Sequence, residues 1–202
     1  MSHSTKPMRR DARANVERLR AAALEIFLEK GLGVPLEEIA RKAGVSVGTL
    51  YNRFGSREAL IDAVVPEVAA ARLQALALDV HSRSTPRRRL EAFVDGMIDL
   101  QTSDAALNDA ILRRFPDALT LRAVCDRSAA LGAELVRAAH EDGSLPAAFT
   151  SDHLDALFWL AGQGSRAPRA AVRWREVLEH SMGAAWTNIS NGALDPLSAS
   201  RE

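Results

Sequence analysis

The stretch over residues 36–54, LEEIARKAGVSVGTLYNRF, constrains the fold of this chain more than any other. Four of its apolar residues recur at the spacing of one helix face: Leu36, Ile39, Ala40 and Ala43. Gly44 follows where a helix commonly ends, because glycine takes a left-handed conformation without steric cost. The sequence therefore predicts a helix over 36–43, a tight turn, and a second helix over 47–54.

The second of these helices has one apolar edge and one polar edge. Leu50 and Phe54 lie one turn apart on the apolar edge. The other positions carry small, hydroxyl, amide or cationic groups, which suit a recognition helix in the major groove of DNA. The candidate DNA-binding residues in and beside this helix are Ser46, Val47, Gly48, Thr49, Tyr51, Asn52 and Arg53.

The chemistry of these residues suggests what each can contact. Ser46 can cap the helix, and it and Thr49 carry short hydroxyls that can reach bases or phosphates. Gly48 allows the backbone to approach the DNA closely. Asn52 can pair with adenine, and Arg53 can bind a phosphate or a guanine.

The distribution of charge supports this reading. The 202 residues have a net charge of zero, but residues 1–57 contain eleven Lys or Arg and six Asp or Glu, a net charge of +5. Residues 58–202 contain fifteen Lys or Arg and twenty Asp or Glu, a net charge of −5. A basic N-terminal part on an acidic remainder fits a DNA-binding head on a body that does not bind DNA.

Composition excludes several classes of protein. No apolar run approaches the roughly 18 residues of a membrane span, and the N-terminus lacks the apolar region of a secretory signal. Cys125 is the only cysteine, so an intrachain disulfide is impossible. These features predict a cytoplasmic protein without membrane contact.

Apolar stripes at helical spacing continue along the chain, and no strand-like alternation competes with them. Pro66 falls inside the fourth predicted helix, where a kink is expected because proline removes a backbone hydrogen bond. The predicted fold is all-α with nine helices, over 15–30, 36–43, 47–54, 56–80, 85–100, 104–114, 118–141, 151–164 and 169–189.

These helices predict a two-part architecture. Residues 1–14 are a disordered basic arm that follows phosphates or simply a solvated tail, and residues 15–60 form a three-helix DNA-binding head with its helix-turn-helix motif over 35–54. Residues 61–190 form a ligand-binding and dimerisation body, and residues 191–202 a flexible tail.

Residues 15–60 resemble the TetR family of bacterial transcriptional regulators. The matching residues are Ala22-Ala23-Leu24-Glu25-Ile26-Phe27, Gly31, Leu36-Glu37-Glu38-Ile39-Ala40, Ala43-Gly44-Val45-Ser46, Gly48-Thr49-Leu50-Tyr51, Phe54 and Ser56-Arg57-Glu58-Ala59-Leu60. The likeness covers about a quarter of the chain. It implies an all-α homodimer that binds a palindromic DNA operator and a small-molecule effector, and a repressor as the family default.

The resemblance also implies residue roles. Tyr51 would give its hydroxyl to a phosphate, and Arg57 would hold a phosphate at the start of the fourth helix. The chain departs from the family pattern at Pro35, which offers no side-chain cap, and at Val47, where many relatives are polar or basic. Val47 can touch a thymine methyl or pack against the head, and packing is slightly favoured.

The body carries two further sets of candidates. The eighth and ninth helices are apolar enough for a four-helix dimer interface or for ordinary core, and the interface candidates are Leu154, Leu157, Phe158, Ala161, Trp174, Leu178, Met182 and Ala185. The ligand-pocket candidates are Phe93, Met97, Leu112, Arg113, Phe115, Leu121, Trp159 and Gln163, for each of which plain core or surface is an alternative. An apolar ligand with one polar or anionic group is preferred.

An enzyme is disfavoured by the sequence. It has no metal-ligand spacing, no glycine-rich phosphate loop and no Gly-x-Ser-x-Gly motif, so no metal or cofactor is expected. The remaining alternative is a helical dimer that binds a ligand or a partner protein without sequence-specific DNA binding. Gly48, Thr49, Tyr51 and Arg57 speak against it.

Overall fold

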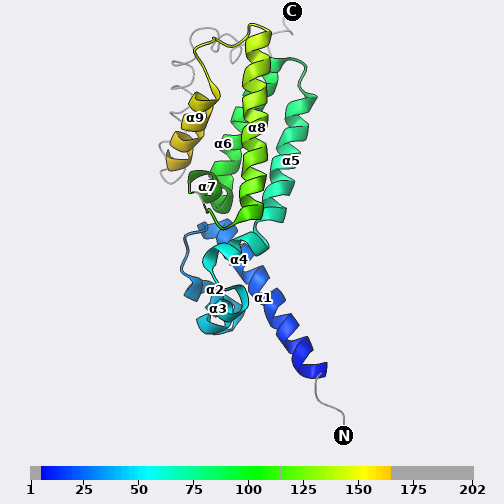
Figure 1. Cartoon of the computed structure of the whole chain (residues 1–202), viewed down its shortest axis with the longest axis vertical. Helices are drawn as coiled ribbons and strands as arrows, with labels where there is room; N and C mark the ends of the chain where they lie inside the picture. Colours follow the sequence, from blue (N-terminus) through cyan, green and yellow to red (C-terminus); the bar gives the residue numbers. More distant parts are fainter. Residues whose placement is uncertain (1–5, 114, 165–202) are drawn as a thin grey trace, which may run out of the picture.

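The structure is a computed structural model that describes residues 6–113 and 115–164, and these fold into helices joined by short loops (Figure 1). The helices are α1 (Lys6–Lys30), α2 (Leu36–Ala43), α3 (Val47–Phe54), α4 (Arg57–Val64), α5 (Pro66–Ser82), α6 (Pro86–Ser103), α7 (Ala105–Leu112), α8 (Leu119–Glu141) and α9 (Ser151–Gly164). We call α1–α4 the head and α5–α9 the body. The all-α fold is confirmed, while the predicted helix over 169–189 and the predicted tail over 191–202 lie outside the described residues.

The two parts follow one another along the long axis of the molecule (Figure 1). α2 and α3 lie at one end beside α1, whereas α5, α6 and α8 run along the body. α4 lies where head and body meet, and it packs against α1, α3, α5 and α8. None of the described helices combines the length and the apolarity needed to cross a membrane.

The first helix begins earlier than predicted, at Lys6 and not at Asn15. Asn15 does not act as an N-cap, because it lies inside α1, where its side-chain oxygen accepts a hydrogen bond from Arg18. Residues 8–14 contain good helix formers and no glycine, and Pro7 stands in the first turn, where proline is tolerated. The part of the predicted arm from residue 6 onwards therefore continues α1.

The helix-turn-helix follows the sequence prediction closely. Gly44 ends α2 with φ +70°, and its N–H and that of Val45 close the last turn. Ser46 caps α3 by accepting from the Thr49 N–H at 3.2 Å, and Gly55 ends α3 with φ +81°. The turn that orients α2 against α3 is thus formed by Gly44, which adopts a positive φ, and by Ser46, which caps the second helix.

Pro66 has a stronger effect than the predicted kink. α4 ends at Val64, and Pro66 takes the first position of a separate helix, α5, where a missing N–H costs little. Nearby, the Ala63 carbonyl accepts a hydrogen bond from Arg20 Nη2 of α1 at 2.6 Å. The helix predicted over 56–80 is therefore two helices, and the first of them is tied to the head.

The buried apolar residues of the described part of the chain form two clusters. The first contains the head core, such as Phe27 and Leu50, but extends through α4 to Leu107 of α7 and Leu121 of α8. The second lies within the body and includes Phe93. The boundary between the clusters therefore lies inside the body, so the predicted division at residue 60 does not coincide with a break in packing.

Candidate nucleic-acid interface and ligand cavity

The outer edge of α3 is open to solvent. Leu50 is fully buried, at 0% exposure, in the head core. The predicted contact residues at Ser46, Gly48, Thr49, Tyr51, Asn52 and Arg53 are all exposed. The large ring of Tyr51 is 48% exposed. These side chains and the turn before α3 therefore form one accessible edge, as predicted.

The hydroxyls at the start of α3 form a small network. Ser46 Oγ and Thr49 Oγ1 lie 2.9 Å apart and share a hydrogen bond, in addition to the cap on the Thr49 N–H. Ser46 and Thr49 thus hold the helix start together, and both side chains stay exposed. At the start of α2, Pro35 provides no side-chain cap, in line with the departure noted from the sequence.

Two of the predicted contact residues have structural roles. Val47 is half-buried against the head core, which favours the packing interpretation. Arg57 Nη1 donates hydrogen bonds to the carbonyls of Leu32 and Val34, at 3.0 and 2.5 Å. The resemblance implies that Arg57 holds a phosphate, but in the structure this nitrogen holds the α1–α2 loop.

A cavity of about 920 Å³ lies among the helices of the body. Its volume is in the range of small-molecule sites. Six predicted pocket residues line it: Phe93, Met97, Leu112, Phe115, Leu121 and Trp159. The other two predicted residues do not line it. Arg113 lines a separate cleft, and Gln163 is exposed and lines neither the cavity nor that cleft. For these two polar candidates the structure favours the alternative interpretation, a surface position, because both side chains are exposed.

A further wall of this cavity, one face of α8, contains a single predicted pocket residue, Leu121. It is lined by residues three or four apart: Leu121, Cys125, Ser128, Ala129 and Gly132. The spacing is that of one helix face, but three of its members are small or polar, so the pattern of apolar residues alone does not indicate a cavity wall. A Cβ on Gly132 would lie 2.9 Å from Phe93 and 3.0 Å from Leu154, so glycine is needed for this close packing.

For α9, the structure favours the second of the two interpretations, ordinary core, over a dimer interface. Leu154, Leu157, Phe158 and Ala161 are buried within the protomer, in the second core cluster. Leu154 and Phe158 also line the cavity, and Phe158 packs edge-on against Phe93 with ring centroids 5.8 Å apart. The other four candidates, Trp174, Leu178, Met182 and Ala185, lie outside the described residues.

The cavity has an apolar interior and a mixed mouth. Phe93 and Met97 lie in the interior, where Met97 sulfur accepts a hydrogen bond from Ser128 at 3.6 Å. Trp159, 51% exposed, lies at the mouth together with the exposed carboxylates of Asp126 and Asp155. An apolar molecule with a polar end matches such a lining.

Cys125 places a free thiol in the lining of the cavity. Burial, and to a smaller extent the neighbouring Asp126 carboxylate, raises the pKa of its thiol to about 11. Alkylation by iodoacetamide should therefore be slow near neutral pH and should rise about tenfold per pH unit until about pH 11. The mass of the intact protein reports this rate, because the chain has no second cysteine. A rate that levels off near pH 8.5, the behaviour of an exposed thiol, would contradict the burial of this residue.

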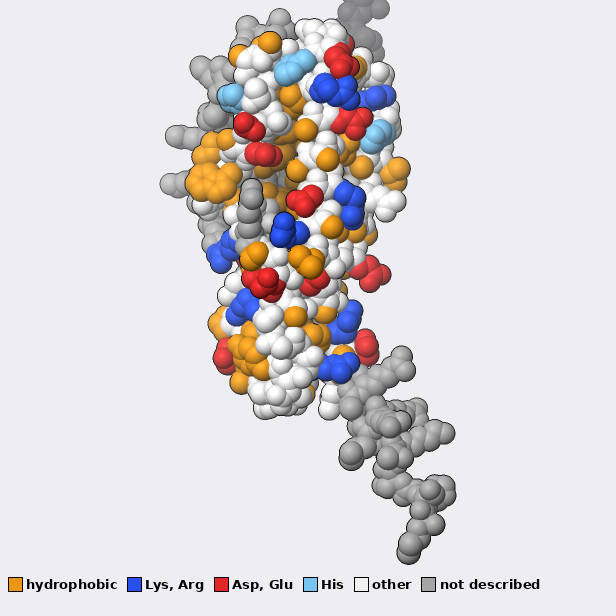
Figure 2. Space-filling model, in the orientation of Figure 1, with side chains coloured by type: hydrophobic (Ala, Val, Ile, Leu, Met, Phe, Trp, Pro, Cys, Tyr) orange, Lys and Arg blue, Asp and Glu red, His pale blue; other side chains and the backbone are white. Residues whose placement is uncertain are grey.

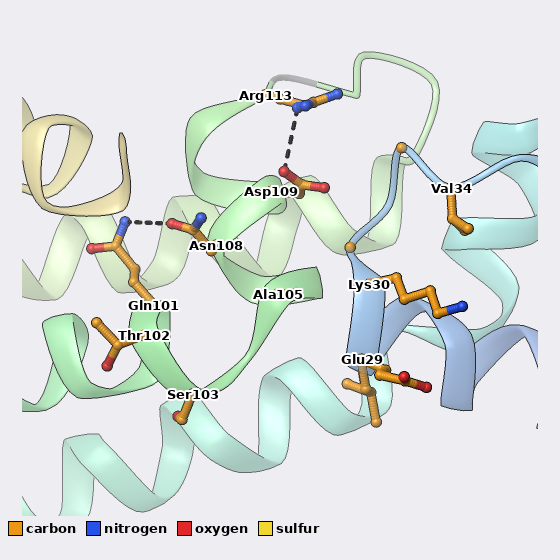
Figure 3. A pocket seen from close by; sticks show the side chains of 13 residues that line it. Glu29, Lys30, Val34, Gln101, Thr102, Ser103, Ala105, Asn108, Asp109 and Arg113 are labelled. Carbon is orange, nitrogen blue, oxygen red and sulfur yellow. Dashed lines mark hydrogen bonds and ion pairs between the residues drawn. The ribbon is translucent and has the colours of Figure 1, made fainter. Parts of the chain in front are cut away.

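A second, polar cleft of about 590 Å³ lies between head and body (Figure 3). Glu29 and Lys30 line it from the end of α1, and Asn108, Asp109 and Arg113 line it from α7 and its end. Asp109 is only 2% exposed, and its carboxylate accepts from the Leu32 N–H at 2.8 Å while it pairs with Arg113 at 3.3 Å. At this cleft, Asp109 of the body therefore binds the α1–α2 loop of the head.

Comparisons with known proteins agree with this arrangement. Residues 19–64 match the family described as "Bacterial regulatory proteins, tetR family". A curated relative, the uncharacterized HTH-type transcriptional regulator TtgW of Pseudomonas putida, is 36% identical over 90 residues, which cover 44% of this chain and 64% of TtgW. The chain spans less than two thirds of the length of the curated relatives that it matches.

Solved structures extend the likeness to most of the chain. FadR of Bacillus subtilis, in complex with stearoyl-CoA, has a TM-score of 0.60 and 15% identity over 83% of this chain and 98% of its own. A putative transcriptional regulator of Saccharomonospora viridis, in complex with choline, has a TM-score of 0.58 and 18% identity. The match covers 85% of this chain and 98% of that regulator. At these identities the likeness concerns the fold. Within this fold, the likeness in sequence to the bacterial regulatory proteins of the tetR family is concentrated in residues 19–64 of the head.

Proposed function

We propose that the protein is a ligand-responsive, DNA-binding transcriptional regulator, a repressor that a small molecule releases from its operator. The observation that carries this proposal is the exposed edge of α3, with Tyr51 and its neighbours open to solvent on a rigidly capped helix. A cytoplasmic location follows from this role. The cavity supports an effector that is largely apolar with one polar group.

A mobility-shift experiment with the DNA upstream of the gene tests the proposal. The protein should bind this fragment in low salt and retain it against a scrambled competitor, because base contacts add to the phosphate contacts. The matched variant Thr49→Ala/Asn52→Ala changes two exposed side chains without touching the core, and it should lose the preference for the fragment. Absence of binding in low salt would favour the alternative, a helical ligand-binding or interaction protein without sequence-specific DNA binding.

The regulator is proposed to act as a homodimer on a palindromic operator, since one such head reaches only a few base pairs. With four of its predicted interface residues buried, α9 offers Leu160, 57% exposed, as an apolar contact for a second copy. Light scattering coupled to gel filtration should give twice the chain mass of 21.9 kDa. A mass of one chain at micromolar concentration would refute the dimer without bearing on DNA binding.

Arg57→Ala should separate the structural role of Arg57 from the predicted phosphate contact. Loss of the hydrogen bonds to Leu32 and Val34 should lower the free energy of unfolding by about 1–3 kcal/mol. The slope of log affinity against log salt should stay unchanged, measured by titrating DNA at several salt concentrations. A slope that is smaller by about one unit would instead show that Arg57 neutralises a phosphate.

A further inference from the structure

The start of α8 obtains its cap from the head. The residue at the N-cap position, Ala118, has no side-chain acceptor and is fully buried. The Leu121 N–H in the first turn instead donates to Asp62 Oδ1 of α4 at 2.8 Å, and the Thr120 hydroxyl donates to Asp62 Oδ2 at 2.9 Å. A carboxylate at this position also meets the positive end of the helix dipole. Both oxygens of one head side chain therefore hold the first turn of α8.

Glu58 extends this attachment by one helical turn. It precedes Asp62 by four residues on α4, so both side chains project from the same face. Its Oε2 accepts from the Asp117 N–H at 2.7 Å. In the space-filling view, acidic side chains lie along the junction of the narrow head and the wider body (Figure 2). The backbone from Asp117 to Leu121 is therefore bound to α4 at two points.

The segment that α4 holds is also a wall of the ligand cavity. Phe115, Pro116, Leu121 and Arg122 all line it, on both sides of the N–H groups that donate to α4. Leu121 combines the two roles, because its side chain lines the cavity while its N–H donates to Asp62. A molecule that displaces this wall must move the donors of those hydrogen bonds.

We infer that Asp62 is the positioning residue that transmits the state of the cavity to the head, through its cap on the first turn of α8. The inference rests on the proposed function, and it assigns the response to one side chain that contacts neither DNA nor ligand. An occupant that shifts the wall favours a state in which the cap is broken and the head is released from its DNA-binding orientation. α4 carries this change to the head directly, since it belongs to the same core cluster as Leu50.

A variant without the cap should still fold. Asp109 of α7 holds the Leu32 N–H independently of Asp62, and Leu60 and Ile61 anchor α4 in the head core. Asp62→Ala is therefore the test variant. Asp142→Ala is the matched control, because Asp142 caps the Ser144 N–H at the far end of α8, at 3.0 Å, within the body.

The cavity can be filled without knowing the natural effector. N-Ethylmaleimide, renewed near neutral pH, where it prefers thiols to amines, until peptide masses show one adduct on Cys125, places a covalent occupant in the cavity. DNA affinity is then measured with and without the adduct in the native protein and in both variants. The adduct should weaken DNA binding by about tenfold or more in the native protein and in Asp142→Ala, and by less than about twofold in Asp62→Ala. A merely structural role for Asp62 would change the affinities but not this ratio.

Two results would overturn the inference. One is an equal effect of the adduct in Asp62→Ala and in the native protein, and the other is no effect in the native protein. If Asp62→Ala does not fold, Thr120→Val removes one of the two hydrogen bonds and should give an intermediate ratio. Cys125→Phe replaces the adduct if labelling is incomplete.

Hydrogen exchange distinguishes failure of the inference from failure of the proposed function. The adduct should speed exchange of the Leu121 amide in the native protein, and exchange in Asp62→Ala should be fast with or without it. If the native protein binds no DNA but shows this pattern, the proposed function fails and the link between cavity and α4 stands. An unchanged Leu121 amide would refute the link whatever the DNA result.

Discussion

Gly31→Ala should lower the free energy of unfolding by about 3–5 kcal/mol. Gly31 has φ +87°, a conformation that costs an alanine about 1–2 kcal/mol. Its new Cβ would also overlap Asp109 Oδ2 and lie 3.2 Å from Cγ of the same side chain. The carboxylate would have to leave the Leu32 N–H, which loses a buried, charged hydrogen bond of about 1.5–3 kcal/mol. Urea unfolding measures the difference.

Gly143→Ala is the matched control for this prediction. Gly143 has a similar conformation, φ +76°, but a Cβ there would meet no atom within 4 Å. The control should therefore show the backbone strain alone, about 1–2 kcal/mol. Equal losses in the two variants would mean that the contact between Asp109 and the α1–α2 loop adds nothing to stability.

Leu50→Ala and Tyr51→Phe should have opposite kinds of effect, although the residues are adjacent on α3. Leu50 is fully buried, so its truncation should lower the free energy of unfolding by about 2–5 kcal/mol. Tyr51→Phe removes only an exposed hydroxyl, so stability should change by less than about 0.5 kcal/mol. Loss of a hydrogen bond to a phosphate should weaken binding to any DNA sequence by about tenfold or more.

Both variants are compared with the native protein by urea unfolding and by DNA titration. The titration uses the upstream fragment and a scrambled fragment of equal length. Tyr51→Phe would fail as a test of phosphate contact if it changed affinity for only one of the two fragments, because phosphates are the same in both. A Leu50→Ala protein of native stability would contradict the placement of Leu50 in the head core.

Local chemistry made most of the fold predictable. Ser46, Ser56, Thr85 and Asp104 each cap the helix that follows, and each accepts from the backbone N–H three residues on. Such caps depend on neighbours in the chain, so the sequence reveals them. The sequence predicts a disturbance at Pro66. Whether this is a kink or a break into two helices depends on how the segments before and after Pro66 pack, which is a tertiary property.

The features that the sequence does not predict concern side chains whose partners lie far along the chain. Arg57 resembles a phosphate ligand in sequence, yet its partners are carbonyls 23 and 25 residues earlier. Asp62 had no predicted role, because the helix start that it caps lies 59 residues later. Apolar α9 residues were equally compatible with a dimer interface, a cavity wall and a protomer core, and only packing decides among these.

The two-cluster core has a consequence for how such a protein can change. Leu73 and Ile111 pack against both clusters, and both line the cavity, which therefore lies at the joint between two separately packed cores. Lining residues of the second cluster, such as Phe93, belong to a different cluster from Leu50 beneath α3. Substitutions of these residues can thus alter which small molecule is accommodated while the packing beneath α3 is preserved. In this architecture, the compound that binds the cavity can therefore change while the DNA-binding head stays folded.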